Sequence, residues 1–166
     1  MSFKAKKVTR SHIVELQAAS EVVFPLLCPV REEEWIPGWE EETYELVYSQ
    51  SGFNELGCIF RTRYLYDTES LWTCIKYDEK RYEIEFLIYI KDVVIRTMNI
   101  LLNKNTDGTC SARFGYTDTA ISEKGNIMVD SFSDDECQRS VAFLGSMINY
   151  FLQNGKKPEL SDLHLA

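Results

Sequence analysis

Histidine is nearly absent from this chain of 166 residues, with only His12 and His164 present. The five cysteines lie far apart and form no Cys-x-x-Cys pair. Because zinc sites need Cys and His clustered at short spacing, the sequence predicts no metal site. The cysteines are expected to be reduced, mostly packed thiols, as in a cytoplasmic protein.

Basic residues are also few. Lysine and arginine total 18 against 26 aspartates and glutamates, which gives a formal charge of −8. An acidic chain without a basic stripe repels phosphate backbones and anionic lipid surfaces. We therefore expect neither nucleic-acid binding nor binding to anionic membranes.

Long apolar runs are missing as well. No segment approaches the roughly 18 apolar residues of a membrane span, so stable membrane insertion is not expected. The first residues, Met-Ser-Phe-Lys-Ala-Lys-Lys, do not read as a signal peptide. The expected location is the cytoplasm.

The common catalytic and cofactor motifs are absent too. There is no Gly-x-Ser-x-Gly, P-loop or Gly-x-Gly-x-x-Gly sequence, and no cofactor is predicted. The acidic runs Glu32–Glu34 and Glu40–Glu42 lack the spacing of a calcium loop. We interpret them as a solvated helix face and a charged rim.

Aromatic residues are plentiful at 13% of the chain, and period-two patterns dominate its middle. Runs rich in β-branched and aromatic residues, bounded by turn-forming residues, are typical of strands. Seven such strands are predicted, over residues 7–18, 43–49, 58–66, 71–78, 82–90, 93–102 and 109–121. The short connections between the last six indicate an antiparallel meander.

Helical signals flank these strands. Ser20 is a candidate N-cap for one short helix, and Pro29 can open a second that ends near Trp35. After a turn at residues 122–126, a long helix is predicted with Ser133 as its N-cap and Gly155 at its end.

This order predicts an α+β helix-grip fold. A seven-stranded curved antiparallel sheet must cover its apolar face, and only the C-terminal helix is long enough to do so. The two short helices between the first two strands would close one end. We expect one domain over residues 1–157 and a mobile or weakly attached tail over residues 158–166. An internal cavity between sheet and helix is the expected ligand site.

Two stretches carry a family resemblance: "AASEVVFPLLCPVREEEWIPGW" (Ala18 to Trp39) and "YTDTAISEKGN" (Tyr116 to Asn126). They resemble the polyketide-cyclase-like members of the START/SRPBCC helix-grip superfamily, which also includes lipid-transfer domains and the major pollen allergens. The resemblance implies binding of a lipid, polyketide or similar molecule, or its cyclisation. Function does not follow from this fold, because its members differ in activity.

Alternation along the strands and spacing along the last helix predict which side chains line the cavity. They are Trp35, Trp39, Phe60, Tyr64, Phe86, Met98, Phe114, Tyr116, Leu144, Ile148 and Phe151. Trp35 and Trp39 have two candidate roles: they can anchor the short helices to the sheet, or one of them can form the mouth of the cavity.

Three functions stay open at this point. The first is a non-catalytic binder of a small apolar or amphipathic molecule. The second is a cyclase or dehydratase that uses His12, Tyr64, Tyr116 or Asp118 as acid, base or orienting groups. The third is a protein-interaction module that uses the outer face of the sheet. Because half the positions of a sheet face solvent, we expect Arg96 and Asp118 to point outward.

Overall fold

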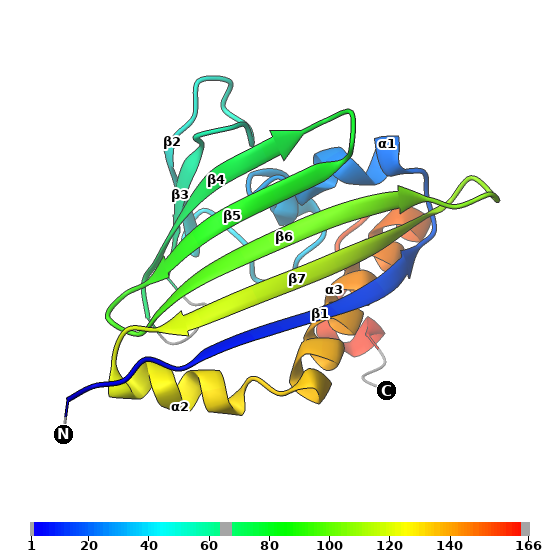
Figure 1. Ribbon diagram of the computed structural model, residues 1–166. Helices are drawn as coiled ribbons and strands as arrows, with labels where there is room; N and C mark the ends of the chain where they lie inside the picture. The colour runs from blue at the N-terminus through cyan, green and yellow to red at the C-terminus, as the bar shows by residue number, and fades with distance from the viewer. Residues whose placement is uncertain (1, 64–67, 164–166) are drawn as a thin grey trace.

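The computed structural model describes residues 2–63 and 68–163, and it confirms the predicted architecture (Figure 1). One seven-stranded antiparallel sheet has the strand order β1-β7-β6-β5-β4-β3-β2. The strands are β1 (Lys7–Leu16), β2 (Tyr44–Tyr48), β3 (Ile59–Thr62), β4 (Ser70–Asp78), β5 (Glu83–Ile90), β6 (Val94–Lys104) and β7 (Cys110–Ala120). The predicted site residue Tyr64 lies outside the described residues.

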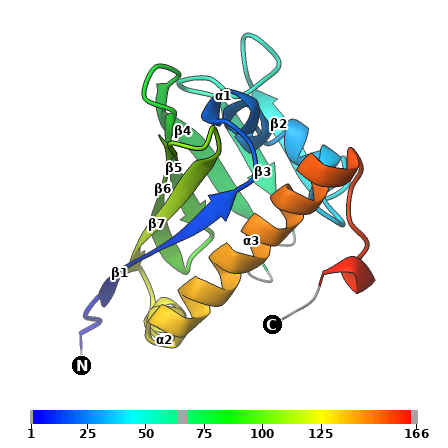
Figure 2. The same ribbon diagram turned by 90° about the vertical axis from the view of Figure 1, so that its right-hand side faces the viewer.

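The helices fall into two groups. Between β1 and β2 lie α1 (Ser20–Val23) and the 3-10 turns η1 (Phe24–Leu27) and η2 (Arg31–Glu34). After β7 come α2 (Glu123–Ser131), α3 (Asp134–Asn154) and the 3-10 turn η4 (Leu160–Asp162). Figure 2 shows α3 crossing the concave side of the sheet.

The sheet has one buried face because its side chains alternate along each strand. On β7 every second residue from Cys110 to Ala120 is buried, and those between are partly exposed. Neighbouring strands pair in register, so their buried residues lie on the same side. This buried side is the concave face, and it holds most of the hydrophobic core.

Helix α3 is held where the sequence predicts. The Ser133 side chain accepts a hydrogen bond from the Glu136 amide, and Gly155 ends the helix with a φ of 65°. Asn149 joins the helix to β1, because its side chain donates to the Glu15 carbonyl at 2.9 Å and accepts from the Gln17 amide at 2.9 Å. The helix therefore packs beside β1 and faces the rest of the sheet across the concave side.

The sequence-based prediction missed α2, which occupies the expected turn. The Ser122 hydroxyl accepts a hydrogen bond from the Gly125 amide and caps this helix. Only Gly125, Asn126 and Val129 are buried, so α2 has no apolar stripe for a period of 3.6 residues to reveal. The prediction of Ser20 as an N-cap was also wrong, since Ala19 holds that position and makes no side-chain cap.

Gly125 lets α2 approach the strands closely. A Cβ at this position would lie 2.0 Å from the Val93 carbonyl oxygen, which is backbone and cannot move aside. We expect Gly125→Ala to lower the free energy of unfolding by about 2 kcal/mol, as overpacking does. Urea denaturation measures this, with the exposed Lys124→Ala on the same helix as control. Equal stabilities of the two variants would contradict the close approach.

The end of the chain is better packed than expected. Pro158 and Leu163 are buried, and Leu163 belongs to the hydrophobic core. The described part of the segment after α3 is therefore attached to the domain.

Candidate ligand-binding site

A row of cross-strand neighbours runs through the middle of the concave face. Phe86 on β5 pairs with Met98 on β6, and Met98 pairs with Tyr116 on β7. Because directly paired residues share a face, the three side chains lie side by side. These are three of the predicted cavity residues, and the structure brings them together. Phe114, a fourth, is buried two residues before Tyr116 on the same face.

Met98 differs from all of its inner-face neighbours. Along β6 it lies between Arg96 and Ile100, each 4% exposed, and across the strands it lies between Phe86 at 4% and Tyr116 at 7%. Met98 itself is only partly buried. Solvent therefore reaches the middle of the concave face, where a closed core would be most tightly packed.

Three aromatic rings cover the β3 side of this face. The Phe60 and Trp72 rings stack with centroids 5.0 Å apart, and Phe86 meets them edge-on at 5.7 and 5.9 Å. The Trp72 indole donates a hydrogen bond to the Thr62 hydroxyl at 3.2 Å. Trp72 was not predicted as a site residue. Its period-two spacing from Ser70 and Cys74, which are buried on the same face of β4, could have placed it here.

The prediction that Arg96 and Asp118 point outward was wrong. They pair across β6 and β7 on the concave face, where their side chains are 5% and 0% exposed. The guanidinium donates to both carboxylate oxygens, with Nε–Oδ1 at 2.6 Å and Nη2–Oδ2 at 2.7 Å. A bidentate pair offsets the cost of burying both charges, which alternation alone cannot indicate.

Two rings enclose this ion pair. The Arg96 guanidinium carbon lies 5.1 Å from the Tyr116 ring centroid and 5.0 Å from that of Phe132. The Tyr116 and Phe132 rings meet at right angles with centroids 5.8 Å apart. Phe132 comes from the link between α2 and α3, so the ion pair also helps to position that link. Asp118 was predicted as a possible acid or base, and in the structure both of its carboxylate oxygens bond to Arg96.

Both tryptophans of the Pro-Gly turn anchor the short helical segments. The Trp35 indole donates to the Leu26 carbonyl at 2.9 Å, and the Trp39 indole donates to the Pro29 carbonyl at 2.8 Å. Trp35 is 2% exposed, whereas Trp39 stacks on Tyr44 with centroids 5.4 Å apart. Trp39 also lines a surface recess, and its place at the mouth of the internal cavity stays a prediction.

The predicted helix residues differ in burial. Ile148 is fully buried, while Leu144 and Phe151 are partly buried against the core. All three lie on the side of α3 that also carries the buried Cys137 and Val141. Leu144 and Phe151 thus lie on the side of α3 that faces the core, and part of each side chain stays accessible to solvent.

His12 lies on the same face as Phe114, with which it pairs across β1 and β7. His12 is partly buried, and its imidazole has no hydrogen-bond partner among residues 2–63 and 68–163. The structure therefore provides no group that orients this imidazole for acid–base chemistry.

Glu32 is a further group that the sequence reading assigned to a solvated face. Burial raises the pKa of its carboxyl to about 8. Its neighbour Glu34 is exposed and forms a salt bridge with Arg31. An acidic run in sequence gave no sign that the carboxyl of one member is less hydrated than those of the others.

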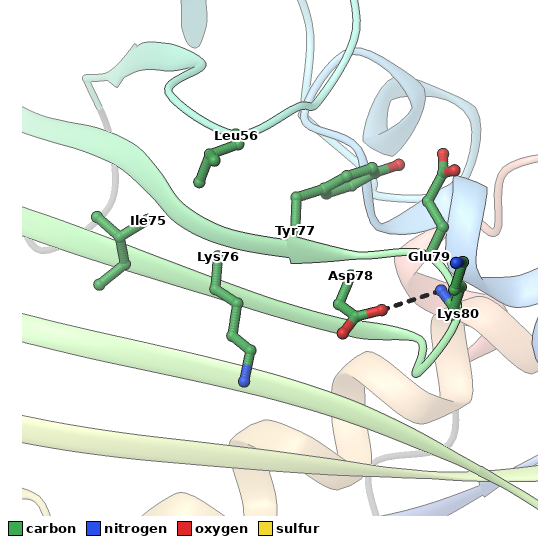
Figure 3. A pocket seen from close by; sticks show the side chains of 7 residues that line it. All are labelled: Leu56, Ile75, Lys76, Tyr77, Asp78, Glu79 and Lys80. Carbon is green, nitrogen blue, oxygen red and sulfur yellow. Dashed lines mark hydrogen bonds between the residues drawn. The ribbon is translucent and has the colours of Figure 1, made fainter.

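Two surface recesses lie away from the middle row. One of about 630 Å³ lies at the end of β4 and is lined by Leu56, Ile75, Lys76, Tyr77, Asp78, Glu79 and Lys80 (Figure 3). The other, of about 390 Å³, is lined by Glu33, Trp39, Glu40, Glu41, Glu42 and Lys157. Of the predicted cavity residues that the structure describes, only Trp39 lines either recess.

Over the described ranges, no three His, Cys, Asp or Glu side chains gather in a way that could hold a metal ion. Within the same residues, no helix is both long and apolar enough to cross a membrane.

No protein-family model matches this chain, and no curated protein matches it in sequence. Solved structures do match. Norcoclaurine synthase from Thalictrum flavum aligns over 90% of this chain and 88% of its own, with a TM-score of 0.68 and 13% identity. Ara h 8.0201 aligns over 90% of this chain and 100% of its own, with a TM-score of 0.60 and 13% identity. The chain has the helix-grip fold.

A third match with this fold is DynU16, encoded in the dynemicin biosynthetic locus. It aligns over 89% of this chain and 48% of its own, with a TM-score of 0.59 and 13% identity. The norcoclaurine synthase has also been solved in complex with dopamine and hydroxybenzaldehyde. At these identities the matches establish the helix-grip fold and leave the activity of this chain to be argued from its own residues.

Proposed function

We propose that the protein binds a small hydrophobic or amphipathic molecule, such as a lipid or polyketide, between the concave face and α3. Met98 carries this proposal, because solvent reaches it while its four inner-face neighbours are buried. An accessible apolar spot inside a curved sheet is the kind of place where ligands bind. That a fold neighbour binds two small molecules supports the same choice.

The side chains around Met98 indicate the ligand class. Phe86 and Tyr116 flank it, and Leu144 and Phe151 supply partly buried apolar surface from α3. Aromatic rings contribute large apolar contact area, and a tyrosine hydroxyl adds a polar contact. This lining favours a ligand with an apolar body and a small polar end.

Catalysis of a cyclase type is the second candidate. Tyr116 lies beside Met98, so the row contains a phenol ring next to the accessible apolar position. An acid–base reaction needs a second titratable group within hydrogen-bond reach, and Asp118 bonds to Arg96 instead. Binding without turnover therefore has the stronger support.

The cytoplasm is the location that we propose. All five cysteines are free and buried. Burial raises the pKa of the Cys58 and Cys74 thiols to about 11 and about 12. Unpaired, unreactive thiols of this kind suit a reducing compartment.

The proposal is tested by filling the space above Met98. We expect Met98→Trp to weaken binding of the neutral fluorescent probe N-phenyl-1-naphthylamine at least tenfold, because the indole would occupy the probe's place. The matched control is Thr97→Trp, which changes the adjacent residue on the opposite face. Equal probe affinity in the two variants and the wild type would contradict the proposed site.

A further inference from the structure

The last part of β4 has a neighbouring strand on one side only. β5 pairs with β4 all the way from Ser70 to Asp78. Among the described residues, β3 pairs with β4 only as far as Thr73, and two further backbone bonds reach no farther than Cys74. Figure 1 shows β4 running on past β3. Outside the ladder with β5, residues 75–78 make no backbone hydrogen bond to the described chain, so they form an open sheet edge.

The loop between β2 and β3 turns away from this edge and is held in place on both sides of Leu56. The Gly57 amide donates to the Cys74 carbonyl at 2.8 Å, and Gly57 has a φ of 83° that favours glycine. The Asn54 amide donates to the Cys28 sulfur at 3.1 Å. Leu56 lies between these two anchors and is 66% exposed. The loop therefore presents an apolar side chain in a fixed position.

A recess of about 630 Å³ separates this loop from the open edge. It is lined by Leu56 and by residues 75–80, and Figure 3 shows Leu56 on its loop across from the end of β4. Ile75 on the strand is 45% exposed. The volume is within the range of about 300–1,000 Å³ that ligand sites have. An open edge beside exposed apolar side chains is a template for pairing with another chain.

Charged side chains often protect an edge from pairing, but here they are bound elsewhere. Lys76 Nζ lies 2.6 Å from Glu83 Oε2 on β5. Asp78 Oδ1 accepts hydrogen bonds from the Lys80 and Arg81 amides, each at 3.0 Å, in the turn to β5. The edge is thus left with its backbone groups and its apolar side chains.

The recess also carries no excess of either charge, although the whole chain has a formal charge of −8. Its charged lining consists of two cations and two anions, which are Lys76, Lys80, Asp78 and Glu79. A partner is therefore not selected for a net charge of either sign. Unpaired backbone groups between apolar side chains match an extended, uncharged stretch of polypeptide, whose own backbone groups repeat at the same spacing.

We propose that this recess binds an extended, uncharged segment of a partner protein, which adds to the sheet as a strand along residues 75–78. Main-chain hydrogen bonds would supply the affinity, and alternate side chains of the segment would supply the specificity. One apolar side chain would lie between Leu56 and Ile75. No described residue of the row around Met98 lines the recess, so this inference does not rest on the proposed ligand site.

Selection from a phage-displayed library of random decapeptides on the wild-type protein tests this inference. We expect the selected peptides to carry uncharged apolar residues at every second position. The strongest is labelled with fluorescein and measured by fluorescence polarisation. Leu56→Asp and Ile75→Asp should each weaken its binding by about tenfold or more, because a carboxylate would lose its hydration in the recess. Ile127→Asp, at a position that is 71% exposed on α2, is the matched control and should bind as wild type.

Methylation of single peptide nitrogens distinguishes strand addition from other modes of binding. An extended peptide turns alternate amides toward β4, so methylation at every second central residue should abolish binding and methylation between them should not. Failure to select any peptide that depends on both Leu56 and Ile75, or the absence of this alternation, would overturn the inference. Sedimentation equilibrium covers the remaining occupant: a wild-type dimer that Ile75→Asp dissociates would assign the edge to a second copy of the chain and also overturn it.

Discussion

Asp118→Ala is expected to lower the free energy of unfolding by about 3 kcal/mol or more. The substitution removes a carboxylate that is 0% exposed and accepts two hydrogen bonds from Arg96. The guanidinium would lose both bonds in a place that water does not reach, and breaking a buried pair costs about 3–5 kcal/mol. Urea denaturation followed by circular dichroism measures the loss.

Glu45→Ala is the matched control for this prediction. Glu45 pairs with Arg61 at 2.8 Å, and these side chains are 46% and 32% exposed, far more than those of Asp118 and Arg96. Exposed pairs contribute about 0–1 kcal/mol, so little change is expected. The double variant Arg96→Met with Asp118→Leu should recover much of the lost stability, because it removes both charges together. A loss in Asp118→Ala no larger than in Glu45→Ala would contradict a stabilising role for the buried pair.

Glu32→Gln is expected to stabilise the protein at high pH. In the unfolded chain this carboxyl loses its proton near the ordinary value of 4.5, whereas in the folded protein it keeps it up to about 8. Between these values the unfolded state binds fewer protons, so the wild-type stability falls as the pH rises through this window. Glutamine has no proton to lose and avoids this penalty.

The expected difference is about 3 kcal/mol at pH 9 and close to zero at pH 4. One pKa unit corresponds to about 1.4 kcal/mol, and partial contact with water reduces the full value. The free energies of unfolding of wild type and Glu32→Gln are compared at both pH values, with Glu33→Gln as control. A difference between wild type and Glu32→Gln that does not change with pH would show that the carboxyl is not buried.

Period-two alternation was enough to predict the middle of the concave face. Phe86, Met98 and Tyr116 were assigned to one face of three separate strands, and the strand register brings them into one row. Alternation could predict this because side chains point to opposite faces of a strand by geometry alone. The anchoring role considered for Trp35 and Trp39 is likewise present in their hydrogen bonds.

The errors occur where a charge or a helix depends on partners far away in sequence. The buried Arg96 is neutralised across the sheet by Asp118, 22 residues later. Helix α2 is short and mostly polar, and it is stabilised by the Ser122 cap and close packing at Gly125. Glu32 resembles Glu33 and Glu34 in sequence, and only the fold around η2 distinguishes them. Local patterns do not carry this information.

The central claim is that a ligand occupies the space over Met98, and methyl NMR tests it directly. The chain has four methionines, of which Met147 is 3% exposed and serves as an internal reference. With ¹³C-methyl-methionine labelling, and with Met98→Leu to assign the signal, N-phenyl-1-naphthylamine is titrated into the protein. A ring-current shift of the Met98 methyl signal at saturation, with Met147 unmoved, is the predicted result. Saturable probe binding that leaves the Met98 signal unchanged would contradict the claim.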